Sequence, residues 1–167
     1  MKPALLVIDV QKKFFKSNPQ TAQSLNNAIE YINAAIALFR AKNLPIFCIQ
    51  HIDEEDQLVP GSEGFDLPEG LQILPSDGHI HKTYSNAFNK TALLTKLQEM
   101  DVDTVIISGY CAEYCVLSTY RGGQDNDLTP MLLRNSLASG IPENIKFVES
   151  ICDIISFGAL KKVLGDS

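Results

Sequence analysis

Hydrophobic positions along the chain follow two different spacings. Residues 4–8 and 45–50 are almost continuously apolar, which is typical of parallel strands covered on both faces. Between them, apolar side chains recur every three or four residues and predict an amphipathic helix over residues 22–41. Pro45 prevents that helix from continuing. Strand, helix and strand in this order indicate a right-handed βαβ unit.

The second half of the chain repeats this alternation. A short strand is expected at residues 80–82, a helix near 91–100, a strand at 104–108 and a helix beginning near Cys111 or Ala112. Two more strands are predicted at residues 128–133 and 146–148, and Ser156 can cap a last helix that ends near Leu164. The pattern predicts an α/β fold with three α/β/α layers around a mostly parallel sheet, in a single domain over residues 1–167.

Residues 53–80 interrupt the alternation. They contain an acidic run at 53–56 and several prolines and glycines. A loop of this length in a compact domain often forms a lid or a pocket wall, and the alternative is a simple surface excursion.

Composition and charge exclude several classes of protein. Apolar residues make up 45% of the chain and charged residues 20%, which are globular proportions. The net charge is −6, and no Lys/Arg cluster exceeds two residues, so we expect no nucleic-acid partner. No apolar run approaches the ~18–20 residues needed to cross a bilayer, and the N-terminus lacks a signal-peptide cleavage site, so we expect no membrane partner. Four cysteines without an export signal favour free thiols and a cytoplasmic location.

Three reactive side chains follow predicted strands. Asp9 ends the first strand, Lys82 ends the short strand at residues 80–82, and Cys115 lies in the first turn of the helix after residues 104–108. Ligands of open α/β sheets bind beyond the carboxyl ends of the strands, where these three would meet. Taken singly, they have ordinary interpretations as a turn residue, a solvated lysine and a packed thiol. A helix N-terminus and a nearby lysine would stabilise a thiolate at Cys115, whereas the nearby Asp9 would oppose it but supply a base.

Four sequence motifs resemble the isochorismatase-like cysteine hydrolases. The segment DVQKKF at residues 9–14 is similar to the family's Asp-x-Gln-x-x-Phe opening. Lys82 and the following Tyr-Ser-Asn-Ala-Phe at 84–88 resemble its lysine segment, and SGYCAEYCVLST at 108–119 resembles its nucleophile turn. The PGSEG sequence at residues 60–64 is also similar. The likeness extends in order over roughly residues 4–120.

This resemblance implies a Rossmann-like, six-stranded parallel sheet and an Asp9-Lys82-Cys115 triad. It also implies an oxyanion hole formed by the backbone N–H groups of Cys111 and Cys115, and a cis peptide bond between Tyr110 and Cys111. The family and the prevalence of symmetric dimers favour a homodimer or a higher homo-oligomer.

The chemistry predicted from these residues is hydrolysis of a C–N bond in a small amide through a thioester intermediate. Three alternatives remain: a metal-containing amidase of the nicotinamidase type, a vinyl ether hydrolase of the isochorismatase type, and a non-catalytic redox protein using Cys111 and Cys115. The nicotinamidase branch resembles a pattern in which an Asp and two or three His bind a metal beside the triad, with Asp-x-His after the second strand. This chain instead has His51 before Asp53, and its only other histidines are His79 and His81, which lie two residues apart and could face one side of a strand. We therefore expect no metal and no cofactor.

The substrate pocket is expected to combine aromatic walls with a few polar groups. Gln11 and His51 are the candidate polar contacts for a small-molecule substrate. Aromatic candidates are Phe14, Tyr84, Phe88, Tyr114 and Tyr120.

Overall fold

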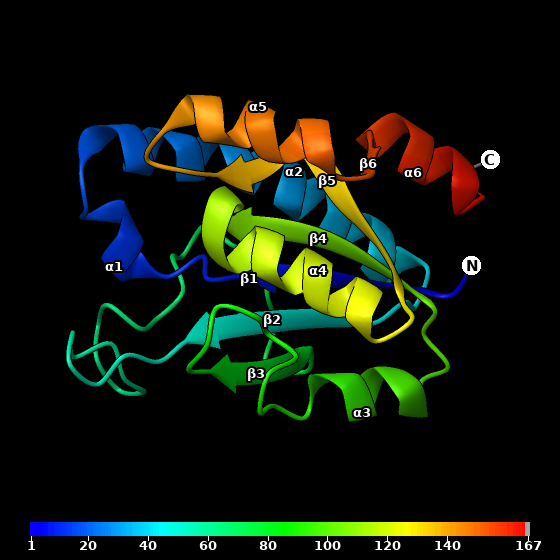
Figure 1. The fold of residues 1–167 in the computed structure, drawn as a ribbon, viewed down its shortest axis with the longest axis horizontal. Helices are drawn as coiled ribbons and strands as arrows, with labels where there is room; N and C mark the ends of the chain where they lie inside the picture. The colour runs from blue at the N-terminus through cyan, green and yellow to red at the C-terminus, as the bar shows by residue number, and fades with distance from the viewer. Residues whose placement is uncertain (166–167) are drawn as a thin grey trace.

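The computed structural model describes residues 1–165 and contains one sheet of six strands, all parallel, in the order β3-β2-β1-β4-β5-β6 (Figure 1). The predicted α/β fold and its six-stranded parallel sheet are confirmed. The strands are β1 (Pro3–Ile8), β2 (Ile46–His51), β3 (Gly78–Lys82), β4 (Thr104–Tyr110), β5 (Thr129–Ala138) and β6 (Ile154–Ile155).

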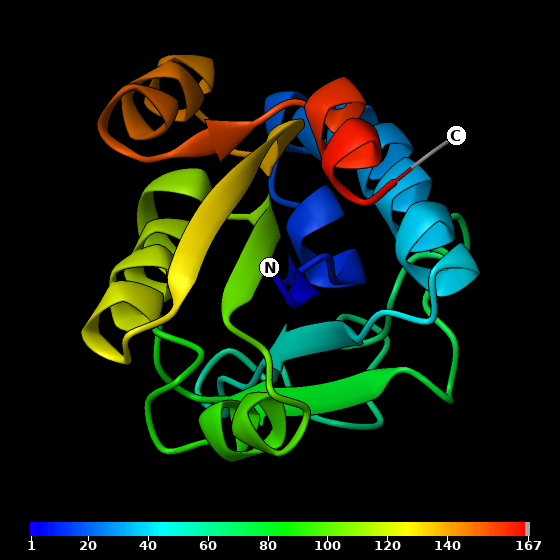
Figure 2. The same ribbon diagram turned by 90° about the vertical axis from the view of Figure 1, so that its right-hand side faces the viewer.

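Helices cover both faces of the sheet, as Figure 2 shows in a view along its edge. On one face, α2 and α6 contribute Leu25, Phe39 and Leu160 to a buried cluster. On the other face, α3, α4 and α5 contribute Leu97, Tyr120 and Val148 to a second cluster. The helices are α1 (Lys12–Phe15), α2 (Pro19–Ala41), α3 (Leu93–Glu99), α4 (Leu117–Asp125), α5 (Pro142–Ile151) and α6 (Phe157–Val163), and a π-helical turn, Ala112–Val116, precedes α4. Among residues 1–165, no helix combines the length and apolar character needed to cross a bilayer.

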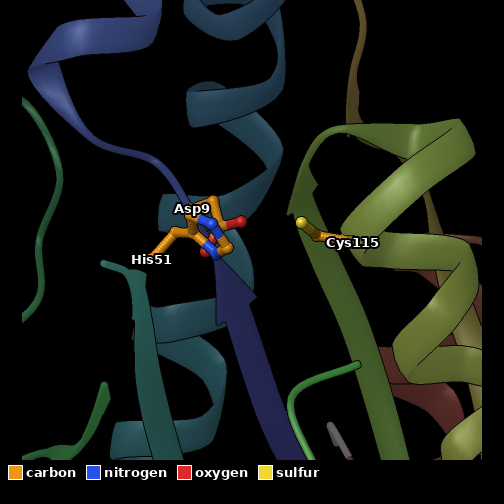
Figure 3. Close-up of side chains that lie close together, drawn as sticks. All are labelled: Asp9, His51 and Cys115. Atoms are coloured by element: carbon orange, nitrogen blue, oxygen red, sulfur yellow. The ribbon is translucent and has the colours of Figure 1, made fainter. Parts of the chain in front are cut away.

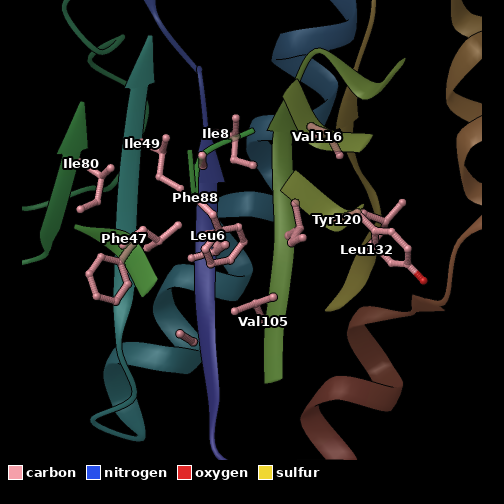
Figure 4. Close-up of a cluster of buried hydrophobic side chains, with 14 of the residues drawn as sticks. Leu6, Ile8, Phe47, Ile49, Ile80, Phe88, Val105, Val116, Tyr120 and Leu132 are labelled. Atoms are coloured by element: carbon pink, nitrogen blue, oxygen red, sulfur yellow. The ribbon is translucent and has the colours of Figure 1, made fainter. Parts of the chain in front are cut away.

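Strand β1 lies at the centre of the sheet and is buried along its whole length. Its side chains alternate between the two cores: Leu6 and Ile8 face one, and Leu5 and Val7 face the other. Figure 4 shows the first of these cores, in which Leu6 and Ile8 lie beside Phe88. Burial on both faces explains why the strand is a continuous apolar run.

The helix boundaries follow local capping chemistry. Helix α2 begins at Pro19 rather than at residue 22, because the side chain of Asn18 accepts a hydrogen bond from the backbone N–H of Thr21 at 2.8 Å. The predicted cap of the last helix is confirmed, since Ser156 accepts from the N–H of Ala159 at 3.2 Å.

The prediction of a strand at residues 146–148 is wrong. These residues lie in helix α5, which has Pro142 in its first turn. Val148 is buried against the sheet while Phe147 is 60% exposed, so the two apolar neighbours point to different environments. Three residues are too few to distinguish a helical from a strand period. The sixth strand is instead the short β6, and β5 continues to Ala138, beyond the predicted end at residue 133.

The strand order places a crevice next to β1. From β1 the chain builds outward through β2 and β3, then returns to place β4 on the other side of β1. In doubly wound sheets, ligands bind at such a reversal, beyond the carboxyl ends of the strands. The residues that follow β1, β2 and β4 therefore define the region of interest.

Candidate active site

The structure brings together the side chains of Asp9, Lys82 and Cys115. The Nζ atom of Lys82 lies 3.1 Å from Oδ2 of Asp9 and 3.2 Å from Sγ of Cys115. Asp9 and Lys82 are almost completely buried, and Cys115 is partly exposed. Figure 3 shows the sulfur of Cys115 directed across the ends of the strands toward Asp9 and His51.

Backbone geometry at two strand ends fixes this arrangement. Asp9 adopts a left-handed conformation with φ of 53° immediately after β1, while its N–H still bonds to the carbonyl of Ile49 at 2.8 Å. Gly109 in β4 has φ of 114°, and a Cβ atom at this position would collide with the carbonyl oxygen of Ile8. Glycine therefore allows β4 to pass close to β1 just before the turn that carries Cys115.

Burial dominates the electrostatics of the site. It raises the pKa of Asp9, and Lys82 opposes this by stabilising the carboxylate. Burial, together with the negative charge of Asp9, raises the pKa of Cys115 to about 11, although Lys82 lowers it. The expected stabilisation of a resting thiolate is therefore not found. Cys115 rests as a thiol beside a buried carboxylate that can accept its proton.

Two polar residues near the triad are linked to each other. The side chain of Gln11 accepts a hydrogen bond from the N–H of His51 at 2.9 Å and donates to the carbonyl of His51 at 3.1 Å. Its amide also lies 3.3 Å from the carbonyl of Phe65. Gln11 is completely buried and holds the end of β2, which places the ring of His51 beside Lys82.

A pocket of about 240 Å³ opens over Asp9 and Cys115. Three of the predicted contact residues, Phe14, His51 and Tyr114, line it. The rings of Phe14 and Tyr110 are 4.7 Å apart and form an aromatic wall. The full lining is Asp9, Lys13, Phe14, His51, Asp53, Asp56, Leu58, Tyr110, Cys111, Tyr114 and Cys115.

The long loop after β2 provides one wall of this pocket. Asp53, Asp56 and Leu58 come from it, and Asp53 pairs with Leu58 through backbone hydrogen bonds in both directions. Lys13 bonds to the carbonyl of Asp56 at 2.7 Å and closes the wall. Of the two interpretations of this loop, the pocket wall is the correct one for residues 53–58. Five further residues line the pocket without having been predicted from the sequence: Lys13, Asp53, Asp56, Leu58 and Tyr110. The acidic run and the position of the loop after a strand end were the available signals.

The other predicted contact residues lie outside the pocket lining. Tyr84 is 43% exposed, and its hydroxyl contacts Lys90. Phe88 and Tyr120 belong to the hydrophobic core, and the Tyr120 hydroxyl accepts from the N–H of Asp153. Gln11 is occupied by the backbone groups described above.

The peptide bond between Tyr110 and Cys111 is cis, as the resemblance implied. The thiol of Cys111 is buried, 3.9 Å from the hydroxyl of Ser139. Burial and the neighbouring Glu113 raise its pKa to about 12. Both Cys111 and Cys115 are free thiols in the structure.

The residues of this site do not fit a metal ion. Donor atoms of Asp9, His51 and Cys115 lie within 4.8 Å of one another, a spacing that a cation could bridge. However, the ammonium of Lys82 already lies within 3.2 Å of all three side chains, and two cations cannot share that space. The remaining histidines are not in the pocket lining: His79 bonds to the carbonyl of Leu74, and His81 packs against Phe65.

Comparisons with known proteins agree with this geometry. The family model for the isochorismatase domain matches residues 3–148. The isochorismatase family protein YddQ of Bacillus subtilis is 28% identical over 142 residues, which cover 83% of this chain and 79% of that protein. Nicotinamidase 3 of Arabidopsis thaliana is 26% identical over 133 residues, covering 71% and 64%. An isochorismatase-like hydrolase from Alkaliphilus metalliredigens superposes with a TM-score of 0.89 at 21% identity, covering 99% of this chain and 100% of that one.

Proposed function

Because the chain belongs to the isochorismatase family of hydrolases, we propose that it hydrolyses the C–N bond of a small amide through a thioester on Cys115. The observation that carries this proposal is the contact of one buried ammonium, that of Lys82, with both the carboxylate of Asp9 and the sulfur of Cys115. The carboxylate and the thiol line the pocket, and the ammonium contacts both of them. Together they supply a base, a nucleophile and a charge-stabilising group.

In the acylation half-reaction, Asp9 accepts the thiol proton and the sulfur attacks the carboxamide carbon. The backbone N–H groups of Cys111 and Cys115 are the proposed donors to the oxyanion of the tetrahedral intermediate. The protonated Asp9 then transfers its proton to the departing nitrogen, so that ammonia or an amine leaves and a thioester remains.

The second half-reaction regenerates the thiol. Asp9 removes a proton from water, the resulting hydroxide attacks the thioester carbon, and the C–S bond breaks. The sulfur recovers a proton from Asp9, and a carboxylic acid leaves. Lys82 stays charged throughout and stabilises the negative charge that develops in turn on Asp9 and on Cys115.

The pocket supports a small substrate. Its volume of about 240 Å³ lies below the ~300–1,000 Å³ of pockets for drug-sized ligands. The Phe14–Tyr110 wall favours a flat apolar body, and the amide must reach Cys115 at the base. The similarity to a protein named nicotinamidase supports the assignment of an amide as substrate.

An ammonia-release screen of small primary amides tests the proposal. We expect turnover by the wild-type protein and none by Cys115→Ala, and mass spectrometry after rapid acid quenching should find the acyl group on Cys115. Cys152→Ser is the matched control, because Cys152 is a partly buried thiol outside the pocket lining. Equal turnover by Cys115→Ala and the wild type would contradict the proposal.

A further inference from the structure

His51 makes a contact that the mechanism above does not use. It is the last residue of β2 and pairs in register with Lys82, the last residue of β3. Its Nδ1 atom lies 2.9 Å from Nζ of Lys82. A lysine ammonium can only donate hydrogen bonds, so Nδ1 must be the acceptor. The ring is then neutral and carries its hydrogen on Nε2.

The ammonium of Lys82 has more neighbours than hydrogens. Besides Nδ1 of His51, its Nζ lies 3.1 Å from Oδ2 of Asp9, 3.1 Å from the carbonyl oxygen of Tyr84 and 3.2 Å from Sγ of Cys115. Three N–H bonds cannot serve four acceptors equally. A thiol sulfur is the weakest acceptor of the four, so the carboxylate, the carbonyl and the imidazole fix the direction of the ammonium.

We propose that His51 is a positioning residue of this site: in its neutral form it holds one N–H of Lys82 and thereby fixes the ammonium between Asp9 and Cys115. The inference rests on the proposed function for its effect on catalysis. The contact itself is independent of any substrate.

The backbone of His51 is also held by hydrogen bonds. The side-chain amide of Gln11 bonds to both the N–H and the carbonyl of His51, at 2.9 and 3.1 Å. The buried Gln11 thus fixes His51, and His51 fixes Lys82. Through these contacts, Gln11 of the DVQ sequence supports the position of Lys82 without touching it.

Protonation of His51 would break the arrangement. A hydrogen on Nδ1 would point at the ammonium of Lys82, and two cations would face each other at 2.9 Å. The other charged groups that act on His51 are Asp9 and Asp53, which favour its protonation. Burial and Lys82 outweigh them and lower the pKa of His51 below its usual 6.5, so the ring stays neutral at neutral pH.

Two-bond ¹H–¹⁵N NMR correlations of the histidine rings test the contact without any substrate. The chain has three histidines, and a His51→Asn variant identifies the signals of His51. We expect a neutral ring with an unprotonated Nδ1 at pH 7, a midpoint below 6.5, and a rise of that midpoint in Lys82→Met. A ring protonated on Nδ1 at pH 7, or a midpoint that Lys82→Met leaves unchanged, would overturn the inference.

The effect on turnover is tested by two variants of similar size. Asn at position 51 offers an amide oxygen near the place of Nδ1, whereas Leu offers no acceptor. We expect kcat of His51→Asn to exceed that of His51→Leu by about tenfold, the scale of one well-placed hydrogen bond to a charged group, with similar KM values. In the wild type, kcat should fall at acid pH as His51 becomes protonated. This part of the fall should be absent in His51→Asn. Equal kcat in two variants of equal thermal stability would contradict the positioning role. If the wild type cleaves no amide, the proposed function fails while the NMR result still decides the His51–Lys82 contact.

Discussion

The ammonium of Lys82 lies 3.1 Å from a carboxylate oxygen of Asp9, and neither side chain is more than 2% exposed. These two groups lie at the ends of different strands and are each costly to bury alone, so they compensate each other beside Cys115. Removing one partner should leave the other as an uncompensated buried charge, which makes the pair testable by both stability and reactivity.

Asp9→Asn should have opposite effects on hydrolysis and on alkylation. Loss of the base should reduce turnover by about 10²–10⁴-fold. Because the charge of Asp9 raises the pKa of Cys115, the variant should move alkylation of Cys115 by iodoacetamide from a midpoint of about 11 to lower pH. Peptide mass spectrometry over a pH series measures this shift, with Cys152 as the internal control, because burial, Arg121 and Asp153 set its pKa and Asp9 does not. An unchanged alkylation profile, or near wild-type turnover, would refute the role of Asp9.

Lys82→Met should destabilise the protein in a pH-dependent way. Breaking a buried ion pair costs about 3–5 kcal/mol, and we expect a loss of this size at pH 7. Burial raises the folded-state pKa of Asp9 above 3.8, so the folded protein binds this proton more tightly and loses stability as pH rises through that pKa. Without Lys82 the pKa rises further. The deficit should therefore shrink on acidification as Asp9 becomes neutral.

Urea denaturation of Lys82→Met between pH 5 and 8 measures this deficit. Lys2→Met is the control, because Lys2 forms an exposed ion pair with Asp101 and its removal should have little effect at any pH. A deficit that is independent of pH would show that Asp9 is not the uncompensated charge.

Gln11→Ala should destabilise the end of β2. It removes the partners of the His51 N–H and carbonyl groups, and an unpaired buried polar group costs about 1–3 kcal/mol. The Phe65 carbonyl keeps its hydrogen bond from the side chain of Gln50 at 3.0 Å. Chemical denaturation against Gln23→Ala, whose amide contacts Asn27 at the exposed surface, isolates the effect of burial. Equal stability of the two variants would contradict the structural role of Gln11.

Gly109→Ala should prevent correct packing of β4 on β1. The added Cβ would meet the backbone of Ile8, which cannot move aside, and the φ of 114° is itself unfavourable for alanine. Gly158→Ala is the matched control, since a Cβ at Gly158 meets nothing within 4 Å. Circular dichroism and yield of soluble protein compare the two. A fully folded Gly109→Ala protein would rule out the close approach of the strands.

Activity should survive chelation. The ammonium of Lys82 takes the place that a cation would need among Asp9, His51 and Cys115, so EDTA treatment should leave turnover unchanged. Elemental analysis of the purified protein accompanies the assay. Stoichiometric zinc, iron or manganese, with activity lost on chelation and restored on re-addition, would move the protein to the metal-containing branch of the amidases.

The sequence alone determined most of the sheet and the identity of three side chains that meet at its edge. Strand β1 is apolar at every position from Ala4 to Ile8 because both of its faces are buried, and this leaves a clear signal. Asp9, Lys82 and Cys115 could be placed at one edge because parallel strands all end on the same side of a sheet. By contrast, residues 146–148 were too short a run to reveal their period, and they form part of a helix.

Only the tertiary structure decided how the site is held and charged. The contact between His51 and Lys82 joins residues 31 positions apart, and Gln11 reaches His51 across 40 positions. No local pattern specifies such contacts, since they depend on the register of β2 against its neighbours. The sequence also could not predict the direction in which the pKa of Cys115 is shifted. The helix N-terminus and Lys82 favour a thiolate, but burial of the sulfur beside Asp9 raises the pKa of Cys115 to about 11. Taking the thiolate out of water costs more free energy than the helix N-terminus and Lys82 provide by stabilising it.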